Sequence, residues 1–283
     1  MARHVGQGDG TLKTASWLRW IWLGPAAFLL LFLAVPLAAL ASRVWDPEAA
    51  ARLLDGPTWR IAALASVQAG LSTVLALAIG LPIASVVSRY RFRGRALAQA
   101  LVTVPFVLPT VVVALAFRSL FGPSAPQGLA VVIVAHAYIN LAVVVRIVGA
   151  RWSQHDDRYE TVARTLGATR LRAFVTVTIP MLRASIASSA GVVFIFSFTS
   201  LGIVLVLGDS TTRTLESQVL RQTSVLLDFP GAIATAVIQL LLVCTVLAIG
   251  AIVTRRAPTE RPLPPTLRPL PRSALGRVSV LAV

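Results

Sequence analysis

The sequence predicts an all-α integral membrane protein with six transmembrane helices and with both termini on the cytoplasmic side. Three observations predict this fold class: 56% of the 283 residues are hydrophobic, only 13% are charged, and six long runs are apolar throughout. A soluble domain carries roughly 25% charged residues, so this chain lacks the polar side chains that a water-exposed surface needs. A soluble globular fold and a disordered chain are therefore excluded, and lipid surrounds most of the protein.

The six apolar runs without a charged residue are the candidate spans. A bilayer core of about 30 Å needs about 20 helical residues, and only the fourth run is a little short of this length. That run gains length through Arg146–Val148, where the arginine side chain can reach the interface. Inside lipid the backbone must satisfy its own hydrogen bonds, which makes runs of this length helices. The runs are Trp20–Ala41, Ile61–Val87, Ala96–Phe117, Leu129–Val145, Ile186–Leu207 and Gly231–Val253.

The runs divide the chain into three parts. These are a cytoplasmic N-terminal segment over residues 1–19, a transmembrane domain over residues 20–256, and a proline-rich cytoplasmic tail over residues 257–283. The first run ends in Ala39-Leu40-Ala41, which resembles a signal-peptidase site. Its apolar stretch is well beyond the length of about 7–15 residues that a signal peptide uses. We therefore expect this run to be a retained membrane anchor.

The basic residues predict the orientation of the spans. Of the 26 lysines and arginines, 20 lie before the first run, after the second and fourth runs, and after the sixth. By the positive-inside rule these segments face the cytoplasm. The net charge of +15 is thus a topology signal. Nucleic-acid binding is not expected, because no basic stripe with interleaved aromatic residues lies outside the membrane flanks.

Residues suited to catalysis or metal binding are scarce. No Asp, Glu, Lys or Arg lies inside any run, which argues against a carrier driven by protons or sodium. Lys13 lacks the preceding glycine of a phosphate-binding loop, and the three histidines are too scattered for a metal site. Cys244 is the single cysteine, which excludes an internal disulfide. We expect no catalytic residue, no metal ion and no cofactor.

A few polar residues and prolines inside the runs are candidates for lining a solute pathway. His136 and Asn140 are four residues apart and share one face of a helix. They either line the pathway or hydrogen-bond to a neighbouring helix, and the sequence leaves both open. Pro105 and Pro109 interrupt the third run twice, which predicts a kinked or unwound segment covered by protein or by a water-filled cavity. Function and packing explain these prolines equally well.

The basic segment after the fourth run, Arg146–Arg183, is longer than a connector needs, which indicates a function of its own. Tyr159–Leu166 can form a short helix with an apolar rib, and Gly167 is a natural left-handed stop for it. A second short helix is expected to end before Pro180. Two short helices at an angle would form a rigid knob that fits a groove in another protein. A helix lying on anionic lipid is the alternative.

This segment resembles the EAA loop of the permease subunits of binding-protein-dependent ABC importers. The family pattern is Glu-Ala-Ala, three residues, Gly, nine residues and Ile-x-Leu-Pro. Here three residues separate Ala163 from Gly167, and nine more lead to Val177-Thr178-Ile179-Pro180, while Glu160 stands one place earlier than the family's Glu. The resemblance implies that residues 159–180 couple the permease to an ATPase. The implied coupling residues are Tyr159, Glu160, Ala163, Leu166, Gly167, Ala168, Ile179 and Pro180.

Three further segments resemble the thiamine and ferric-iron branch of these permeases: residues 104–110, 135–141 and 198–208. With the loop, the resemblance covers roughly residues 60–250. Many members of that branch are two six-helix halves fused in one chain. The proline-rich tail, followed by the apolar residues 274–283, looks like the start of a second half.

The resemblance implies the permease component of an ATP-driven importer of type I, with ferric iron or thiamine as the solute. The implied partners are a cytosolic ABC ATPase dimer, a periplasmic or lipoprotein solute-binding protein, and a second permease half that is fused, separate or an identical copy. ATP hydrolysis would take place in the ATPase, so this chain is not itself an enzyme. A self-contained secondary carrier or channel and a non-transporting scaffold are the alternatives.

Overall fold

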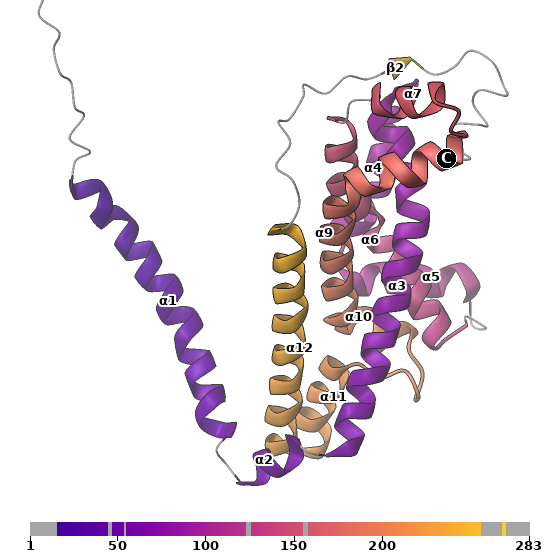
Figure 1. Ribbon diagram of the computed structural model, residues 1–283. Coiled ribbons are helices and arrows are strands. Elements are labelled where there is room, and N and C mark those ends of the chain that lie inside the picture. Colours follow the sequence, from indigo (N-terminus) through magenta and orange to yellow (C-terminus); the bar gives the residue numbers. More distant parts are fainter. Residues whose placement is uncertain are drawn as a thin grey trace, which may run out of the picture.

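The computed structural model describes residues 16–44, 47–53, 55–122, 126–154, 158–255 and 268–269. Within these residues the chain is an elongated assembly of helices (Figure 1). The long helices are α1 (Ser16–Val44), α3 (Gly56–Arg89), α6 (Leu129–Trp152), α9 (Ile179–Phe198) and α12 (Phe229–Arg255). The shorter elements are α2 (Pro47–Leu53), β1 (Tyr90–Arg91), α4 (Arg95–Val107), α5 (Thr110–Phe121), α7 (Arg158–Thr165), α8 (Arg170–Ala173), the π-turn η2 (Phe174–Thr178), α10 (Leu201–Leu207), α11 (Leu215–Arg221), the π-turn η3 (Gln222–Leu226) and β2 (Arg268–Pro269).

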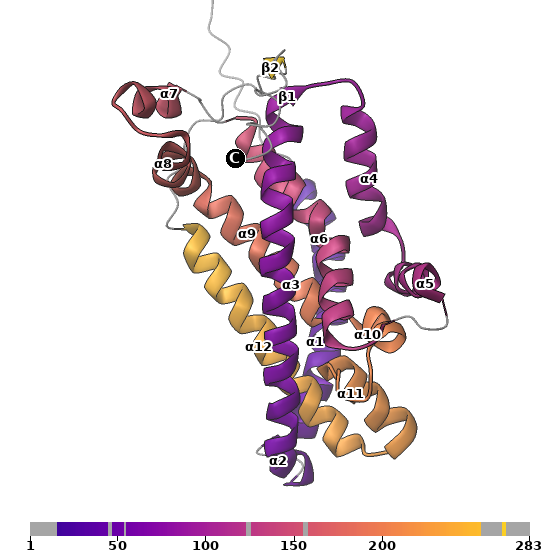
Figure 2. The same ribbon diagram turned by 90° about the vertical axis from the view of Figure 1, so that its right-hand side faces the viewer.

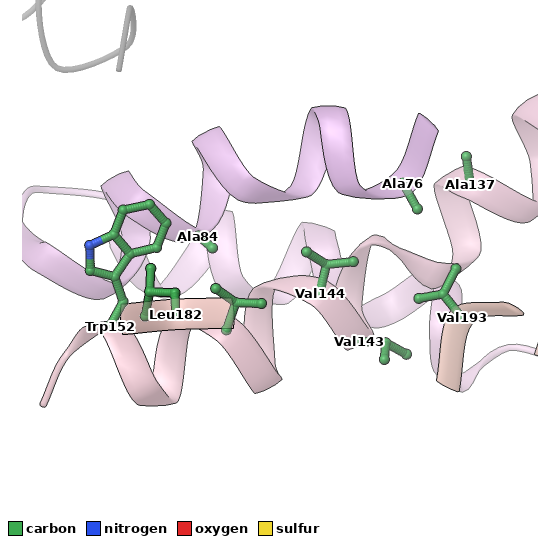
Figure 3. Packing of buried hydrophobic residues seen from close by; sticks show 9 residues of the cluster. Ala76, Ala84, Ala137, Val143, Val144, Trp152, Leu182 and Val193 are labelled. Carbon is green, nitrogen blue, oxygen red and sulfur yellow. The ribbon is translucent and has the colours of Figure 1, made fainter. Parts of the chain in front are cut away.

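Helices α3, α6 and α9 pack against one another and form the core of the bundle (Figure 3). Their contact faces carry small residues, and Ala76, Ala84 and Ala137 are buried there. A Cβ atom at Gly80 would lie 2.8 Å from the Cβ of Val144, so α3 approaches α6 too closely for a side chain at this position. Helix association in lipid depends on such close packing rather than on removal of apolar surface from water.

Helix α1 stands apart from this core for most of its length (Figure 1). It meets the rest of the described chain at α2 and α12. The side chains from Leu23 to Ala39 are all exposed in the isolated chain. Because these residues are apolar, their surroundings must be lipid or another protein surface.

Four helical segments are long and apolar enough to cross a membrane: Gly56–Arg89, Leu129–Trp152, Arg170–Phe198 and Phe229–Thr254. The bent pair of α4 and α5 would be a fifth span, and Leu23–Ala39 in α1 is a shorter apolar helix. The predicted class, an all-helical multi-pass membrane protein, is confirmed. The predicted count of six is reached within the described residues only if both the bent pair and α1 are spans.

The third predicted span is broken in the structure. Helix α4 ends at Val107, and α5 begins at Thr110 after a bend of 109°. Leu108 adopts the extended backbone (φ −70°, ψ 144°) that is favoured before a proline, and Pro109 has no N–H with which to continue α4. Pro105 stays inside α4 and is buried, so only one of the two prolines ends the helix.

The fifth predicted span, Ile186–Leu207, is wrong as a single helix. Helix α9 starts earlier, at Ile179, and ends at Phe198, and α10 is a separate helix from Leu201. Ser200 between them is extended (φ −105°, ψ 108°). The break places α10 against α5, where a Cβ at Gly202 would lie 2.8 Å from Cγ2 of Val111. An apolar run does not reveal this break, because Thr and Ser are common inside membrane helices.

The segments that the basic residues assign to the cytoplasm lie together at one end of the bundle. β1, β2 and α7 lie at this end, and α2 lies at the opposite end (Figures 1 and 2). β2 pairs in parallel with β1, with Arg268 opposite Tyr90. Apart from β2, the predicted tail over residues 257–283 lies outside the described residues, as does the predicted N-terminal segment up to residue 15.

Candidate solute pathway and coupling loop

A cavity of about 370 Å³ lies where the two helix breaks meet, and we call it the central cavity. Thr110, which follows the α4–α5 break, and Ser200, in the α9–α10 break, both line it. His136 and Asn140 of α6 and Glu216 of α11 line it as well. Irregular backbone at membrane depth is tolerated where it lines a cavity, so the two breaks and the cavity form one structural feature.

His136 is held in place by α3. The side-chain amide nitrogen of Gln68 lies 2.8 Å from Nδ1 of His136 and 3.0 Å from Oγ of Ser72. Because an amide nitrogen can only donate, this contact is a hydrogen bond in the tautomer of His136 that carries its proton on Nε2. Nε2 is buried and has no hydrogen-bond partner in the described chain. His136 therefore brings to the wall of the central cavity a ring nitrogen that has no hydrogen-bond partner among the described residues.

Asn140 is held in a similar way by α6 and α9. Its Nδ2 donates to the carbonyl oxygen of His136 at 2.9 Å and to Oγ of Ser197 at 3.3 Å. Its Oδ1 and Oγ of Ser200 are both buried without a hydrogen-bond partner among the described residues. The two interpretations of His136 and Asn140 are thus compatible, because these residues bond to neighbouring helices and also line the cavity.

The prolines that were candidates for the pathway lie next to the cavity wall. The wall contains Phe106 and Thr110, the residues that follow Pro105 and Pro109. Pro109 makes the bend that separates α4 from α5, and Pro105 is buried within α4. Both prolines therefore shape the chain around the cavity.

Glu216 is an acidic residue of the cavity wall that the sequence did not point to. Its Oε1 accepts a hydrogen bond from Nε2 of Gln239 at 3.2 Å. Partial burial raises the pKa of the Glu216 carboxyl, although the bond from Gln239 acts in the opposite direction. Glu216 also borders a wider cavity of about 750 Å³ between α11 and α12. It lies in a polar stretch between two apolar runs, so only the fold shows that this carboxylate is partly buried.

The central cavity offers polar groups rather than a set of metal ligands. The described residues contain no group of three or more His, Cys, Asp and Glu side chains that could hold a metal ion. His4 and His155, two of the three histidines considered for a metal site, lie outside the described residues. The residues that line the cavity carry neutral N–H, O–H and C=O groups together with the carboxylate of Glu216. Such groups can form hydrogen bonds to a polar solute.

The coupling loop, residues 159–180, begins with the predicted short helix and left-handed stop. Gly167 follows α7 with φ +92°. The N–H of Gly167 donates to the carbonyl oxygen of Arg164 at 3.1 Å, and the N–H of Ala168 donates to that of Ala163 at 3.0 Å. These two bonds form a Schellman cap, which places a left-handed residue after the helix and therefore favours glycine.

Large apolar side chains are exposed on this loop, next to the exposed Arg158, Arg164, Arg170 and Arg172. Tyr159 and Val162 of α7 are 58% and 56% exposed, and Leu166 after the helix is 83% exposed. Leu171 of α8 is 68% exposed. An exposed apolar patch of this kind at the cytoplasmic end of a membrane protein marks a site of contact with protein or lipid.

The end of the loop differs from the prediction that a helix stops before Pro180. Instead, α8 continues through η2 into α9, and Pro180 lies in the first turn of α9. The N–H of Ile179 bonds to the carbonyl oxygen of Phe174, five residues back, which is a π-helical bond. This wider turn accommodates Pro180, which has no N–H to donate. The loop is thus joined to the transmembrane helix α9 by continuous helix.

Glu160 faces the transmembrane helices. Its Oε2 lies 3.3 Å from Nη2 of Arg89 at the end of α3, and the side chains of Arg89 and Glu160 are only 11% and 16% exposed. The guanidinium of Arg89 also lies 5.9 Å from the ring centre of Trp152. Trp152, at the end of α6, stacks on Phe174 of η2 with ring centroids 6.1 Å apart. One cluster therefore joins the ends of α3 and α6 to α7 and η2 of the coupling loop.

Comparison with known proteins agrees with this architecture. Residues 76–257 match the model of the family described as "binding-protein-dependent transport system inner membrane component". The chain belongs to this family. It is a multi-pass permease of the inner membrane, as the resemblance in the coupling loop predicted.

The permease is 32% identical over 252 residues to the molybdenum transport system permease protein ModB of Mycobacterium tuberculosis, covering 82% of this chain and 94% of ModB. It is 28% identical over 248 residues to the sulfate transport system permease protein CysT of Salmonella typhimurium, covering 80% and 88% of the two chains. It is 29% identical over 238 residues to the thiamine transport system permease protein ThiP of Brucella abortus, covering 78% of this chain and 44% of ThiP.

The fold of the permease is that of an ABC importer membrane subunit. A chain in the crystal structure of a bacterial alginate ABC transporter, in complex with an alginate-bound periplasmic protein, superimposes with a TM-score of 0.64. The match covers 87% of this permease and 98% of that chain at 17% sequence identity. At this identity the likeness shows the fold alone.

Proposed function

We propose that this permease forms the solute pathway of an ATP-driven ABC importer and that the solute passes through the central cavity. The observation that carries the proposal is the meeting of two helix breaks at a cavity with unsatisfied polar atoms, namely Nε2 of His136, Oδ1 of Asn140 and Oγ of Ser200. A buried polar atom without a partner costs about 1–3 kcal/mol. A polar solute in the cavity offsets this cost by bonding to these atoms.

We favour a small tetrahedral oxyanion of the molybdate and sulfate type as the solute. With its ring proton on Nε2, His136 is a neutral donor, as is the hydroxyl of Ser200, and both can bond to oxyanion oxygens without placing a fixed charge at membrane depth. The likeness to ModB and CysT supports the same class. Ferric iron, expected from the sequence, gains no support from these relatives.

Thiamine is the second candidate, and one residue favours it. Thiamine is a cation, and the carboxylate of Glu216 in the cavity wall would attract it while repelling an oxyanion. The likeness to ThiP points the same way.

In this proposal, residues 159–180 couple the movement of the permease to ATP hydrolysis. The apolar patch of Tyr159, Val162 and Leu166 would dock into a groove of a separate cytosolic ATPase. Continuous helix from α8 to α9 and the pair of Arg89 and Glu160 would carry the movement of the patch to the transmembrane helices. The permease itself would not hydrolyse ATP.

Two further partners complete the importer. The apolar side chains of Leu23–Ala39 in α1 are exposed in this chain, and a second permease half would cover part of them. That half is fused, separate or an identical copy. A periplasmic or lipoprotein solute-binding protein would deliver the solute at the end of the bundle where α2 lies.

Cysteine accessibility tests the pathway directly. In a Cys244→Ser background, Ser200→Cys places a thiol in the central cavity, and Leu247→Cys places one on the exposed apolar face of α12 as the matched control. The importer is reconstituted with its ATPase and binding protein, and each variant is treated with a water-soluble maleimide.

We expect labelling of Ser200→Cys that changes when ATP is bound and that solute reduces, and no labelling of Leu247→Cys. Protection by molybdate supports the oxyanion, whereas protection by thiamine supports the second candidate. Labelling of Ser200→Cys that neither nucleotide nor solute changes would contradict a pathway through the central cavity.

A further inference from the structure

A separate cavity of about 460 Å³ lies between the ends of α3 and α6 and the start of α4. Helix α4 runs beside α3 and α6 at the end of the bundle that the basic residues assign to the cytoplasm (Figure 2). The polar side chains in its wall are Arg95, Gln99 and Thr103 of α4, Ser88 of α3, Arg146 of α6, and Ser153, which follows α6. We call it the arginine pocket. It shares no residue with the central cavity.

The arginine pocket carries two positive charges that no carboxylate balances. No Asp or Glu is among the described residues that line it, and neither Arg95 nor Arg146 forms an ion pair within the described chain. Arg89, at the end of the same helix α3, differs because Glu160 neutralises it. Two guanidinium groups facing one cavity without a counter-charge attract an anion.

The donors of the pocket are positioned for an external ligand. Nε of Arg95 donates to the carbonyl oxygen of Val87 at 2.8 Å, which fixes the side chain at the pocket wall and leaves its other N–H groups for a ligand. The hydroxyls of Thr103 and Ser153 donate to their own helix backbone, at 2.8 and 2.9 Å. The donors left to bind a ligand are the two guanidinium groups and the amide of Gln99.

The pocket also has room and an apolar wall. Gly149 in the wall has no side chain, and a Cβ atom there would be in ordinary van der Waals contact with Ser88, 3.4 Å from its Cβ. Val87, Val102 and Val145 line the remainder. A volume of about 460 Å³ is within the usual range of roughly 300–1,000 Å³ for small-molecule sites.

We propose that the arginine pocket binds a tetrahedral oxyanion group of the phosphate and sulfate class. Arg95 and Arg146 would neutralise its charge, and Gln99 would donate a further hydrogen bond. Guanidinium groups suit this ligand because their planar N–H pairs match two oxygens of a tetrahedral anion. The oxyanion comes either from a free ion in the cytosol or from the phosphate of an anionic lipid, whose chains would follow the apolar wall.

The test uses the full chain, purified with the partners that remain bound to it, in nanodiscs of neutral phosphatidylcholine. Binding of radiolabelled sulfate is measured for the wild type and for Arg95→Gln and Arg146→Gln. Arg183→Gln is the matched control, because Arg183 is an exposed arginine of α9 outside the pocket. A parallel arm adds phosphatidylglycerol to the nanodiscs and counts the retained lipid by native mass spectrometry.

For a free ion, we expect saturable sulfate binding that Arg95→Gln and Arg146→Gln each weaken by about tenfold or more and that Arg183→Gln leaves unchanged. For a lipid phosphate, we expect phosphatidylglycerol to abolish sulfate binding, and retained phosphatidylglycerol to fall in the two pocket variants. Arg146→Gln keeps the test valid if Arg95→Gln fails to fold, because Arg95 bonds to the backbone of α3 whereas Arg146 forms no such bond within the described chain. The proposal is overturned if the pocket variants change the binding of neither sulfate nor phosphatidylglycerol. It is also overturned if Arg183→Gln weakens binding as much as the pocket variants do.

Discussion

Glu160 of the coupling loop and Arg89 at the end of α3 form an ion pair, with Oε2 and Nη2 3.3 Å apart and both side chains mostly buried. The pair links the segment proposed to contact the ATPase with a helix of the transmembrane core. Burial shields the two charges from solvent, so the contact is stronger than an exposed ion pair between the same residue types.

Glu160→Gln should therefore lower the amount of solute imported per ATP hydrolysed by about tenfold, which corresponds to a coupling free energy in the usual range of roughly 1–3 kcal/mol. The double variant Arg89→Glu with Glu160→Arg should recover part of this loss. Asp55→Asn is the control, because it breaks an exposed pair with Arg52 at the other end of the bundle. An unchanged ratio in Glu160→Gln would show that the pair has no part in coupling.

Gly167 allows a test of docking by the apolar patch of Tyr159, Val162 and Leu166 without a steric clash inside the permease. Its φ of +92° is a strained conformation for other residues, but a Cβ there meets no atom within 4 Å. We expect Gly167→Asp to insert normally and to abolish transport, because the added charge meets the ATPase. Gly167→Asn has the same shape without the charge and tolerates positive φ, so it should retain most of the uptake.

Gly94→Asp is the matched control for Gly167→Asp. Gly94 has φ +87°, is exposed and also has open space around a built Cβ, but it lies outside the coupling loop. Its variant should transport normally in the same vesicle assay. Equal loss of uptake in both variants would trace the effect to backbone strain, estimated at about 1 kcal/mol, rather than to docking.

We expect Glu216 to make the charge preference of the proposed pathway dependent on pH. Burial raises the pKa of its carboxyl above the ordinary value of 4.5, so the folded protein binds a proton more tightly than the unfolded chain does. Stability attributable to Glu216 therefore decreases as the pH rises from about 4.5 through the raised pKa. Over the same range, uptake of an oxyanion should fall as the carboxylate forms and repels it.

Glu216→Gln should raise oxyanion uptake at neutral pH and flatten its dependence on pH, measured with the same ATPase and binding protein as the wild type. If thiamine is the solute, the same variant should lower uptake instead. A pH profile identical in the wild type and in Glu216→Gln would exclude this carboxylate from the pathway.

Hydrogen bonds to Asp209 stabilise the segment between α10 and α11. Its Oδ1 accepts hydrogen bonds of 2.7 to 3.0 Å from the hydroxyls and the backbone N–H groups of Thr212 and Thr211, which lower the pKa of Asp209 from 3.8 to about 2. Because the folded pKa lies below the unfolded one, this contribution to stability is complete above about pH 4 and is lost as the pH falls toward 2. Thermal unfolding of purified Asp209→Asn should thus show a smaller loss of stability over this range than the wild type.

The predictable part of the fold is the part that hydrophobicity alone determines. The helices α3, α6 and α12 lie where long apolar runs predict them. The left-handed stop at Gly167 was predictable as well, because glycine after a helical stretch is a local signal. Both features depend on residues close in sequence or on transfer into lipid.

The features that shape the central cavity depend on contacts between distant segments. The break at Ser200 occurs inside an apolar run and has no local signal in the sequence. It accompanies the packing of α10 against α5, which is distant in sequence. Pro105 and Pro109 have the same chemistry in the sequence, yet only Pro109 ends a helix. Glu216 lies between two apolar runs in the sequence, and only the packing of α11 places it in the wall of the same cavity as His136 and Asn140.

The most direct test of the account asks what drives transport. The purified permease is reconstituted in liposomes, first alone with proton or sodium gradients of either sign, and then with its ATPase and binding protein and with ATP inside the compartment that the ATPase faces. Uptake of labelled molybdate, sulfate or thiamine is measured in each case. We predict no gradient-driven uptake by the permease alone and uptake that requires both partners and ATP; solute accumulation driven by an ion gradient without them would contradict the central claim.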